Sequence, residues 1–257
     1  MRKRPDVPLL ADVLDENCSA EVSTRLGVAF GHVCRYFAFL HYIFEEYEKA
    51  SNDFVENTKA IQVMFEQGVA GNAFTEEQVP VLDQAPVLHD LLHLRIETFY
   101  LFAKIFLDKI AHFLEFYFGQ GRGLSLDSHD QLVKNFAAFS ESKGLALTVE
   151  FLDLAERLKT DISDYRDYQI SHEKSPRTLY STSYDAEGKT TITQLRLNPT
   201  EKDRQARSTP LADLLSAADR YLRVTFEILK SNANKSSAKG EATKAESNRG
   251  ELASFSS

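Results

Sequence analysis

The chain has 257 residues, which is enough for one large domain or two small ones, and its 43% hydrophobic and 11% aromatic content can fill a real core. Gly and Pro are few and Trp is absent, whereas Leu, Ala, Glu and Lys are common, so the composition favours helices. The formal net charge of −8 excludes a surface that coats nucleic acid broadly but leaves room for a small basic groove.

The N-terminus, the apolar stretches and the cysteines lead us to expect a cytoplasmic protein. Met1 to Arg4 are mostly basic, but no uninterrupted apolar run follows, so we expect no signal peptide. The apolar stretches 27–44 and 101–118 contain charged and histidine side chains that are too costly inside a membrane, which favours buried helices of a bundle. Cys18 and Cys34 have neither zinc nor redox spacing, as is typical of reduced thiols.

Helices predominate over the first two thirds of the sequence. Hydrophobic periodicity, with the positions of Gly and Pro, predicts helices over about 20–49 and 52–67, a loop over 68–83, and helices over 86–118, 128–143 and 147–171. Pro86 suits the first turn of the long helix, where a missing N–H costs nothing. Ser128 and Gln131 match a capping box that begins the next helix, and Gly144 ends it.

The sequence changes character after residue 177. Segments 178–184 and 189–197 are β-rich and flank a turn, so we predict a small hairpin inserted between the last two core helices. Thr209 and Pro210 cap a final amphipathic helix. Its predicted inward positions are Leu211, Leu214, Leu215, Ala218, Leu222, Phe226 and Leu229. Residues 231–257 are poor in apolar side chains, so we predict a disordered tail whose deletion leaves thermal stability unchanged.

Together these elements predict an all-α fold. We expect one helical domain over residues 1–230, a bundle with long antiparallel helices and the hairpin inserted at about 178–197.

One segment carries side chains suited to a reaction. Arg166 and Asp167 lie near the end of the predicted 147–171 helix, and His172 follows Arg166 by six residues. A fixed cation with a group that titrates near neutral pH can perform acid–base chemistry on a phosphodiester. His172 also continues an apolar stripe from Ile162 and Tyr165, so packing is the alternative. On an ideal helix the arginine and the histidine lie roughly 120° apart, so they converge only at an unwound helix end or across two protomers.

The arrangement of Arg166, Asp167 and His172 resembles the hallmark of the HEPN superfamily (higher eukaryotes and prokaryotes nucleotide-binding domains). In that family an arginine, a polar residue and a histidine lie near the end of a late helix. The resemblance covers about residues 84–230, and the motif is its specific part. Active members are metal-independent ribonucleases whose two motifs meet at a dimer interface, whereas others only bind. The resemblance implies a homodimer without a cofactor, a role in defence or as a toxin, and a protein antitoxin or regulatory partner.

The same resemblance implies a role for each residue of the segment. His172 would accept the proton of a ribose 2′-OH or donate one to the leaving oxygen, and Arg166 would neutralise the pentavalent phosphate. Asp167 would orient one of the two. The candidates for substrate binding are Tyr168, which would stack on a base, and Lys174 and Arg177, which would hold flanking phosphates.

A polar stripe runs along the predicted 86–118 helix and leaves three interpretations open. It is either a solvated face with an ion pair between Lys104 and Asp108, or the wall of an RNA groove in which Lys104 contacts the substrate. The third is a metal site of His89, His93 and Glu97, which are spaced four residues apart. The candidate functions are therefore an RNA-cleaving protein, a non-catalytic helical interaction or RNA-binding module, and a metal-binding helical protein.

Overall fold

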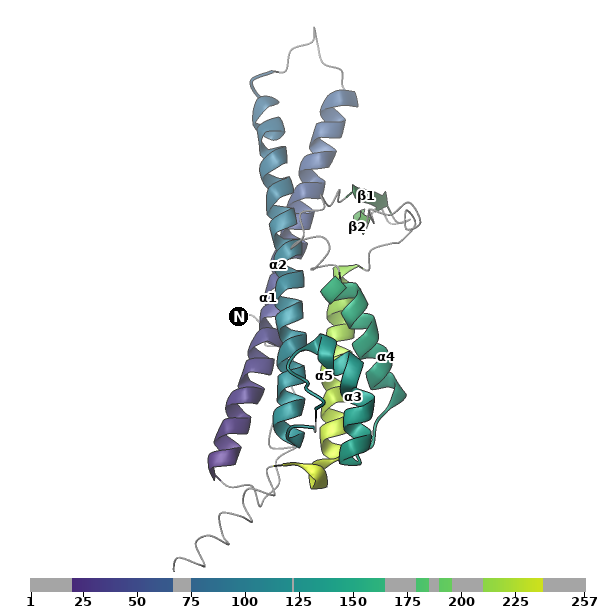
Figure 1. The fold of residues 1–257 in the computed structure, drawn as a ribbon. Coiled ribbons are helices and arrows are strands. Elements are labelled where there is room, and N and C mark those ends of the chain that lie inside the picture. Colours follow the sequence, from purple (N-terminus) through teal and green to yellow (C-terminus); the bar gives the residue numbers. More distant parts are fainter. Residues whose placement is uncertain are drawn as a thin grey trace, which may run out of the picture. The chain divides into compact units, whose positions relative to one another are not determined.

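The computed structural model describes residues 20–66, 75–121, 123–164, 179–184, 190–195 and 210–237. These residues are mostly helical, which confirms the predicted all-α class (Figure 1). The α-helices are α1 (Ala20–Glu66), α2 (Val79–Phe118), α3 (His129–Lys143), α4 (Val149–Leu158) and α5 (Leu211–Ser231). A π-helix, η3 (Lys159–Asp164), follows α4, and a 3₁₀ turn, η6 (Ala233–Lys235), follows α5.

Two short strands complete the described elements. Strand β1 (Leu179–Tyr184) pairs antiparallel with β2 (Thr190–Leu195), in a register that places Leu179 opposite Leu195 and Tyr184 opposite Thr190. None of the helices in the described ranges combines the length and the apolar character needed to cross a bilayer.

The chain forms two compact units. Unit 1 consists of Met1–Phe39, Phe102–Ser163 and Ser216–Ser257, and unit 2 consists of Leu40–Leu101 and Asp164–Leu215. Because α1 and α2 each contribute one half to unit 1 and the other half to unit 2, neither unit is a continuous piece of chain. A single domain over residues 1–230 stays a prediction.

The core of unit 1 is a helical bundle rich in aromatic side chains. The ring of Phe30 on α1 contacts Phe113 on α2 and Phe226 on α5, with centroids 5.8 and 5.2 Å apart. Phe151 on α4 contacts Phe136 on α3 at 4.9 Å and Tyr221 on α5 at 5.1 Å. All seven inward positions predicted for α5 are buried, which confirms the amphipathic reading of this helix.

Unit 2 contains the second half of α1 and the first half of α2. The amide of Asn57, which is 9% exposed, donates a 2.9 Å hydrogen bond to the carbonyl oxygen of Val81. Arg95 and Glu46 add an ion pair at 3.8 Å. Leu88, Leu92, Ile96 and Phe99 recur at helical spacing on α2 and are all buried.

The predicted break near residue 50 is wrong, because α1 continues through it. Ser51 and Asn52 are weak helix formers, but neither is a helix breaker, and Asn52 is exposed to solvent. Buried side chains lie on both sides of this point, including Leu40 and Val55, and their packing outweighs a local loss of a few tenths of a kcal/mol.

The predicted start of α2 at Pro86 is also wrong, because the helix begins at Val79. The side chain of Gln78 accepts a 3.0 Å hydrogen bond from the backbone N–H of Thr75, and the N–H of Val79 donates to the Thr75 carbonyl. This is the glutamine half of a capping box, which begins the helix within the predicted loop. Pro86 therefore lies inside the helix, on an exposed side where water can satisfy the carbonyl that its missing N–H leaves free.

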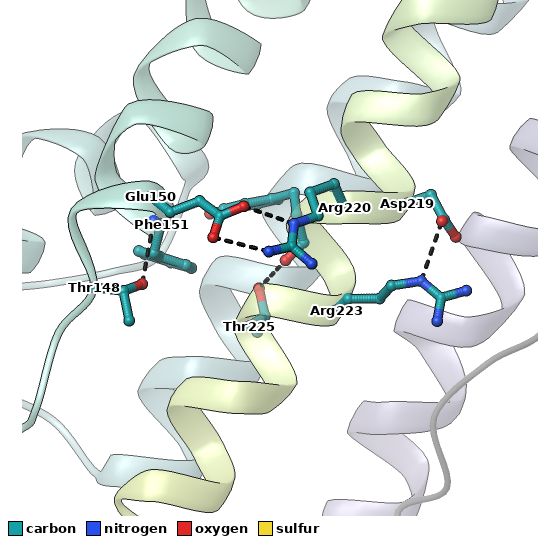
Figure 2. A network of polar contacts seen from close by, with 8 residues as sticks. Thr148, Glu150, Phe151, Asp219, Arg220, Arg223 and Thr225 are labelled. Atoms are coloured by element: carbon teal, nitrogen blue, oxygen red, sulfur yellow. Dashed lines mark hydrogen bonds and ion pairs between the residues drawn. The ribbon is translucent and has the colours of Figure 1, made fainter.

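Helix α3 has a well-formed cap at both ends, and α4 has one at its start. The Ser128 side chain accepts from the N–H of Gln131, and Gly144 ends α3 in the left-handed conformation with φ of 62°, as predicted. Thr148 caps α4, which joins α5 through a two-bond ion pair in which Arg220 donates to Glu150 at 2.6 and 2.9 Å (Figure 2).

The residues after α5 pack against the bundle as far as Ser237. Asn232 is 2% exposed and exchanges two hydrogen bonds with the backbone of Ala146, at 2.7 and 2.9 Å. The Ser237 N–H donates to the carbonyl of Tyr117, one of the last in α2 that has no partner within the helix. The predicted tail begins at residue 231, whereas the packed chain extends to Ser237. Residues 238–257 of that tail lie outside the described residues.

Because residues 232–237 pack on the bundle, we now expect truncation after Ser231 to lower thermal stability. The sequence alone had predicted no change. We expect Asn232→Ala to lower the free energy of unfolding by about 2 kcal/mol, because it removes three hydrogen bonds from a buried amide. Urea denaturation measures the change. Asn234→Ala, an exposed asparagine two residues away, is the matched control and should change little. Equal stability of the two variants would show that Asn232 contributes nothing.

Candidate functional site

The predicted catalytic residues lie in a part of the chain that the structure does not describe. Arg166, Asp167 and His172 fall within residues 165–178, as do Tyr168, Lys174 and Arg177, the predicted substrate contacts. The described chain ends directly before them in η3, where the hydrogen-bonding pattern of α4 changes from α-helical to π-helical at Lys159. Single turns of π-helix occur frequently at functional sites.

Lys104 is the predicted substrate contact that the structure does describe, and it is buried. Its side chain is 7% exposed, and its ammonium lies 2.5 Å from Oδ2 of Asp130 and 3.2 Å from Oδ1 of Asp108. The predicted ion pair with Asp108 is present, but the solvated-face interpretation is wrong at Lys104. A phosphate could reach this ammonium only if both carboxylates were displaced.

Asp108 and Asp130 extend this ion pair to the start of α3. The backbone N–H of His129 donates a 2.8 Å hydrogen bond to Oδ1 of Asp108, so the carboxylate holds both a cation and the first N–H of the helix. Burial acts to raise the pKa of Asp130, but the hydrogen bond and charge of Lys104 outweigh it and hold the pKa below its ordinary value. The cluster therefore joins α2 to α3 through charge.

His129 is the buried titratable group of this cluster. Its side chain is fully buried, and its ring lies edge-on to Tyr221, with centroids 5.6 Å apart. Burial first, and then the charge of Lys104, lower the pKa of His129 to about 3, so the imidazole is neutral at physiological pH. Neither ring nitrogen makes a hydrogen bond within the described structure, and the buried hydroxyl of Tyr221 is also unpaired there.

This arrangement serves the fold rather than a reaction. An imidazole without exposed surface cannot contact a substrate, and a pKa of about 3 makes it a poor proton carrier near neutral pH. Neither His129 nor Tyr221 was among the residues predicted to be functional. The signal was present in the capping box, which places His129 at the first position of α3, and in the inward face of α5, which includes Tyr221.

The three side chains of the predicted metal site, His89, His93 and Glu97, do not form a ligand group. His89 and His93 lie together, with Nε2 atoms 3.2 Å apart, and burial together with the charge of His89 lowers the pKa of His93. Among the described residues, however, no three His, Cys, Asp or Glu side chains form a group that could hold a metal ion. Glu97 therefore does not complete a site with the two histidines.

Comparison of the chain with protein-family models, with curated proteins and with solved structures finds no match.

Proposed function

We propose that this protein is a HEPN-like, metal-independent endoribonuclease with Arg166, Asp167 and His172 as its catalytic residues. The observation that supports the proposal is the π-helix η3, which ends two residues before Arg166, because single turns of π-helix are frequent at functional sites. For the pair to converge, the helix must also unwind between Arg166 and His172, or a second protomer must supply one of them, because an ideal helix points the two side chains apart. The proposal therefore joins a motif in the sequence to a local change in the helix that leads into it.

The proposed reaction is transfer of a phosphodiester to the adjacent ribose 2′-OH. In a homodimer, His172 of one protomer accepts the 2′-OH proton as the new P–O bond forms. His172 of the other protomer donates a proton to the 5′ oxygen as its bond to phosphorus breaks. Arg166 stabilises the extra negative charge of the transition state, and Asp167 orients one of the pair. A homodimer supplies both histidines, and no cofactor is needed.

Other parts of the proposal concern the surroundings of this site. Tyr168 stacks on a base, and Lys174 and Arg177 hold flanking phosphates. The proposal also has the long helices running antiparallel and the β1–β2 hairpin forming one wall of the site. The proposed setting is the cytoplasm, in a defence or toxin role that a protein antitoxin or regulatory partner controls.

An RNA-cleavage assay tests the proposal. We expect His172→Ala and Arg166→Ala each to slow cleavage of single-stranded RNA by about two orders of magnitude or more, because each removes a positioned acid–base group or charge. The double variant should be little slower than either single variant, because groups that act as a unit are not additive. Cleavage should persist in EDTA.

Two variants serve as matched controls. Arg35→Ala removes an exposed arginine elsewhere, and His89→Ala removes a histidine of the metal alternative; neither should change the rate. Loss of cleavage with His89→Ala and in EDTA would favour the metal-dependent function instead. Unchanged cleavage by folded Arg166→Ala and His172→Ala would make the motif structural and overturn the proposal.

A non-catalytic helical interaction or RNA-binding module is the second candidate, and one observation favours the interaction module. The charge of Lys104 is neutralised by Asp108 and Asp130, which removes a cation from the predicted RNA surface of a chain that already carries a net charge of −8. Binding of RNA or of a protein without any cleavage would support this module.

A further inference from the structure

A groove with an apolar floor and a cationic rim lies within unit 1, between the first part of α1 and the last part of α2. Its volume is about 450 Å³, which is within the usual range for small-molecule sites. The lining residues recur at helical spacing on the two helices and are Thr24, Arg25, Val28, Ala29 and His32 from α1, with Lys109, His112, Phe113 and Phe116 from α2.

The floor of this groove is apolar, and the side chain of Val28 in it is exposed to solvent. Val28 is 58% exposed, whereas Phe113 below it is 1% exposed and belongs to the bundle core. Phe116 is half-buried and presents its ring to the guanidinium of Arg25, which lies 5.1 Å from the ring centroid. This cation–π contact holds the guanidinium over the aromatic surface and leaves its N–H edges for an anion.

The charged and titratable side chains of the rim are all basic. No carboxylate lines the groove, and within the described part of the chain neither Arg25 nor Lys109 forms an ion pair. His112 is fixed by a hydrogen bond from Nε2 to the carbonyl oxygen of Asp127. The chain as a whole has a net charge of −8, but this groove is locally positive. It therefore favours ligands that carry a negative charge.

We propose that this groove binds a small planar organic anion: an aromatic ring system that carries one carboxylate, phosphate or sulfonate group. The ring lies on Val28, Phe113 and Phe116, where it buries apolar surface. The anionic group contacts Arg25, whose planar fork donates hydrogen bonds to two anion oxygens at once, and Lys109 adds a second positive charge. This site does not depend on the proposed RNA cleavage, because none of its residues belongs to the Arg166–His172 segment.

The test uses a fluorescent pair that differs in one group. Anilinonaphthalenesulfonate carries the ring system with an anion, and phenylnaphthylamine carries nearly the same rings without it. We expect the full chain to bind the sulfonate more tightly than the neutral probe. Arg25→Gln and Lys109→Gln should each weaken binding of the sulfonate by about tenfold or more, since each removes a charge-assisted contact, while binding of the neutral probe is unchanged. Ala29→Phe should weaken binding of both probes by filling the groove.

Matched controls and displacement complete the experiment. Arg35→Gln removes an exposed arginine of the same helix outside the groove, and Ala137→Phe enlarges an exposed alanine on α3; both should bind like the unmodified chain. Displacement of the probe by naphthoate or by naphthyl phosphate supports the site, and the stronger competitor identifies the anionic group. Unchanged binding by Arg25→Gln and Lys109→Gln, an equal loss in Arg35→Gln, or displacement by neither compound would overturn the proposal.

Discussion

Replacing Lys104 by methionine should lower the free energy of unfolding by about 3 kcal/mol. Methionine keeps the apolar stem but removes the ammonium that pairs with both Asp108 and Asp130. Removing one partner of a buried ion pair typically costs about 3–5 kcal/mol, because the other charge stays behind without compensation. We expect the lower end of this range, since the carboxylates are 28% and 39% exposed and water can solvate them in part. Urea denaturation at neutral pH measures the change.

The ion pair between Arg220 and Glu150 provides the matched control (Figure 2). It also joins two helices, but its side chains are 49% and 46% exposed. Arg220→Met should therefore change the urea midpoint far less than Lys104→Met, because exposed ion pairs contribute little to stability. If the two methionine variants lose the same stability, burial of Lys104 does not set the strength of its ion pairs. Asp108→Asn combined with Asp130→Asn and Lys104→Met should recover part of the loss, because no unpaired charge then remains.

Acidification below pH 6.5 should destabilise the protein through His129. The pKa of this imidazole is about 3 in the folded chain and 6.5 when it is free in the unfolded chain. Between these two values only the unfolded state binds the proton, so the free energy of unfolding falls as the pH falls, by about 1.4 kcal/mol for each pH unit. Lowering the pH from 6.5 to 4.5 should thus remove about 2 kcal/mol, because half of the unfolded chains already hold this proton at pH 6.5.

Two substitutions separate titration of His129 from its packing. His129→Gln and His129→Leu differ in polarity, but neither side chain titrates. Both should therefore reduce the pH dependence of urea stability between pH 6.5 and 4.5 by the equivalent of one proton, whatever their stability at neutral pH. Asp130 acts in the same direction at lower pH, because its pKa is held below its ordinary value. An unchanged slope in both variants would show that the folded chain accepts a proton at His129.

Local patterns in the sequence predicted several elements correctly. Ser128, Gln131 and Gly144 define α3 because capping and left-handed glycine act over only a few residues. The inward face of α5 follows from its 3.6-residue period alone. The same logic was available at Thr75 and Gln78, where the glutamine half of a capping box starts α2, but the neighbouring Gly and Pro residues favoured a loop.

Contacts between distant residues could not be predicted in this way. The sequence suggests the ion pair of Lys104 with Asp108, four residues away, but not the one with Asp130, which depends on how α3 folds back on α2. From the sequence Asn232 belongs to a polar tail, because its hydrogen-bond partner Ala146 lies far away along the chain. The Arg166–His172 pair stays a prediction from the motif. The groove at Arg25 was likewise invisible, because it requires two helix faces to meet.

The discontinuous make-up of unit 1 determines when it can fold during synthesis. Its aromatic core joins Phe30 near the start of α1 to Phe226 in α5, and its last described residue is Ser237. A chain leaving the ribosome therefore carries the apolar faces of α1 and α2 without their partner until α5 has been made. Contacts between residues so far apart in sequence slow folding, and the exposed apolar surface is open to chaperones and to aggregation meanwhile. Unit 1 thus completes its folding only after translation has passed α5.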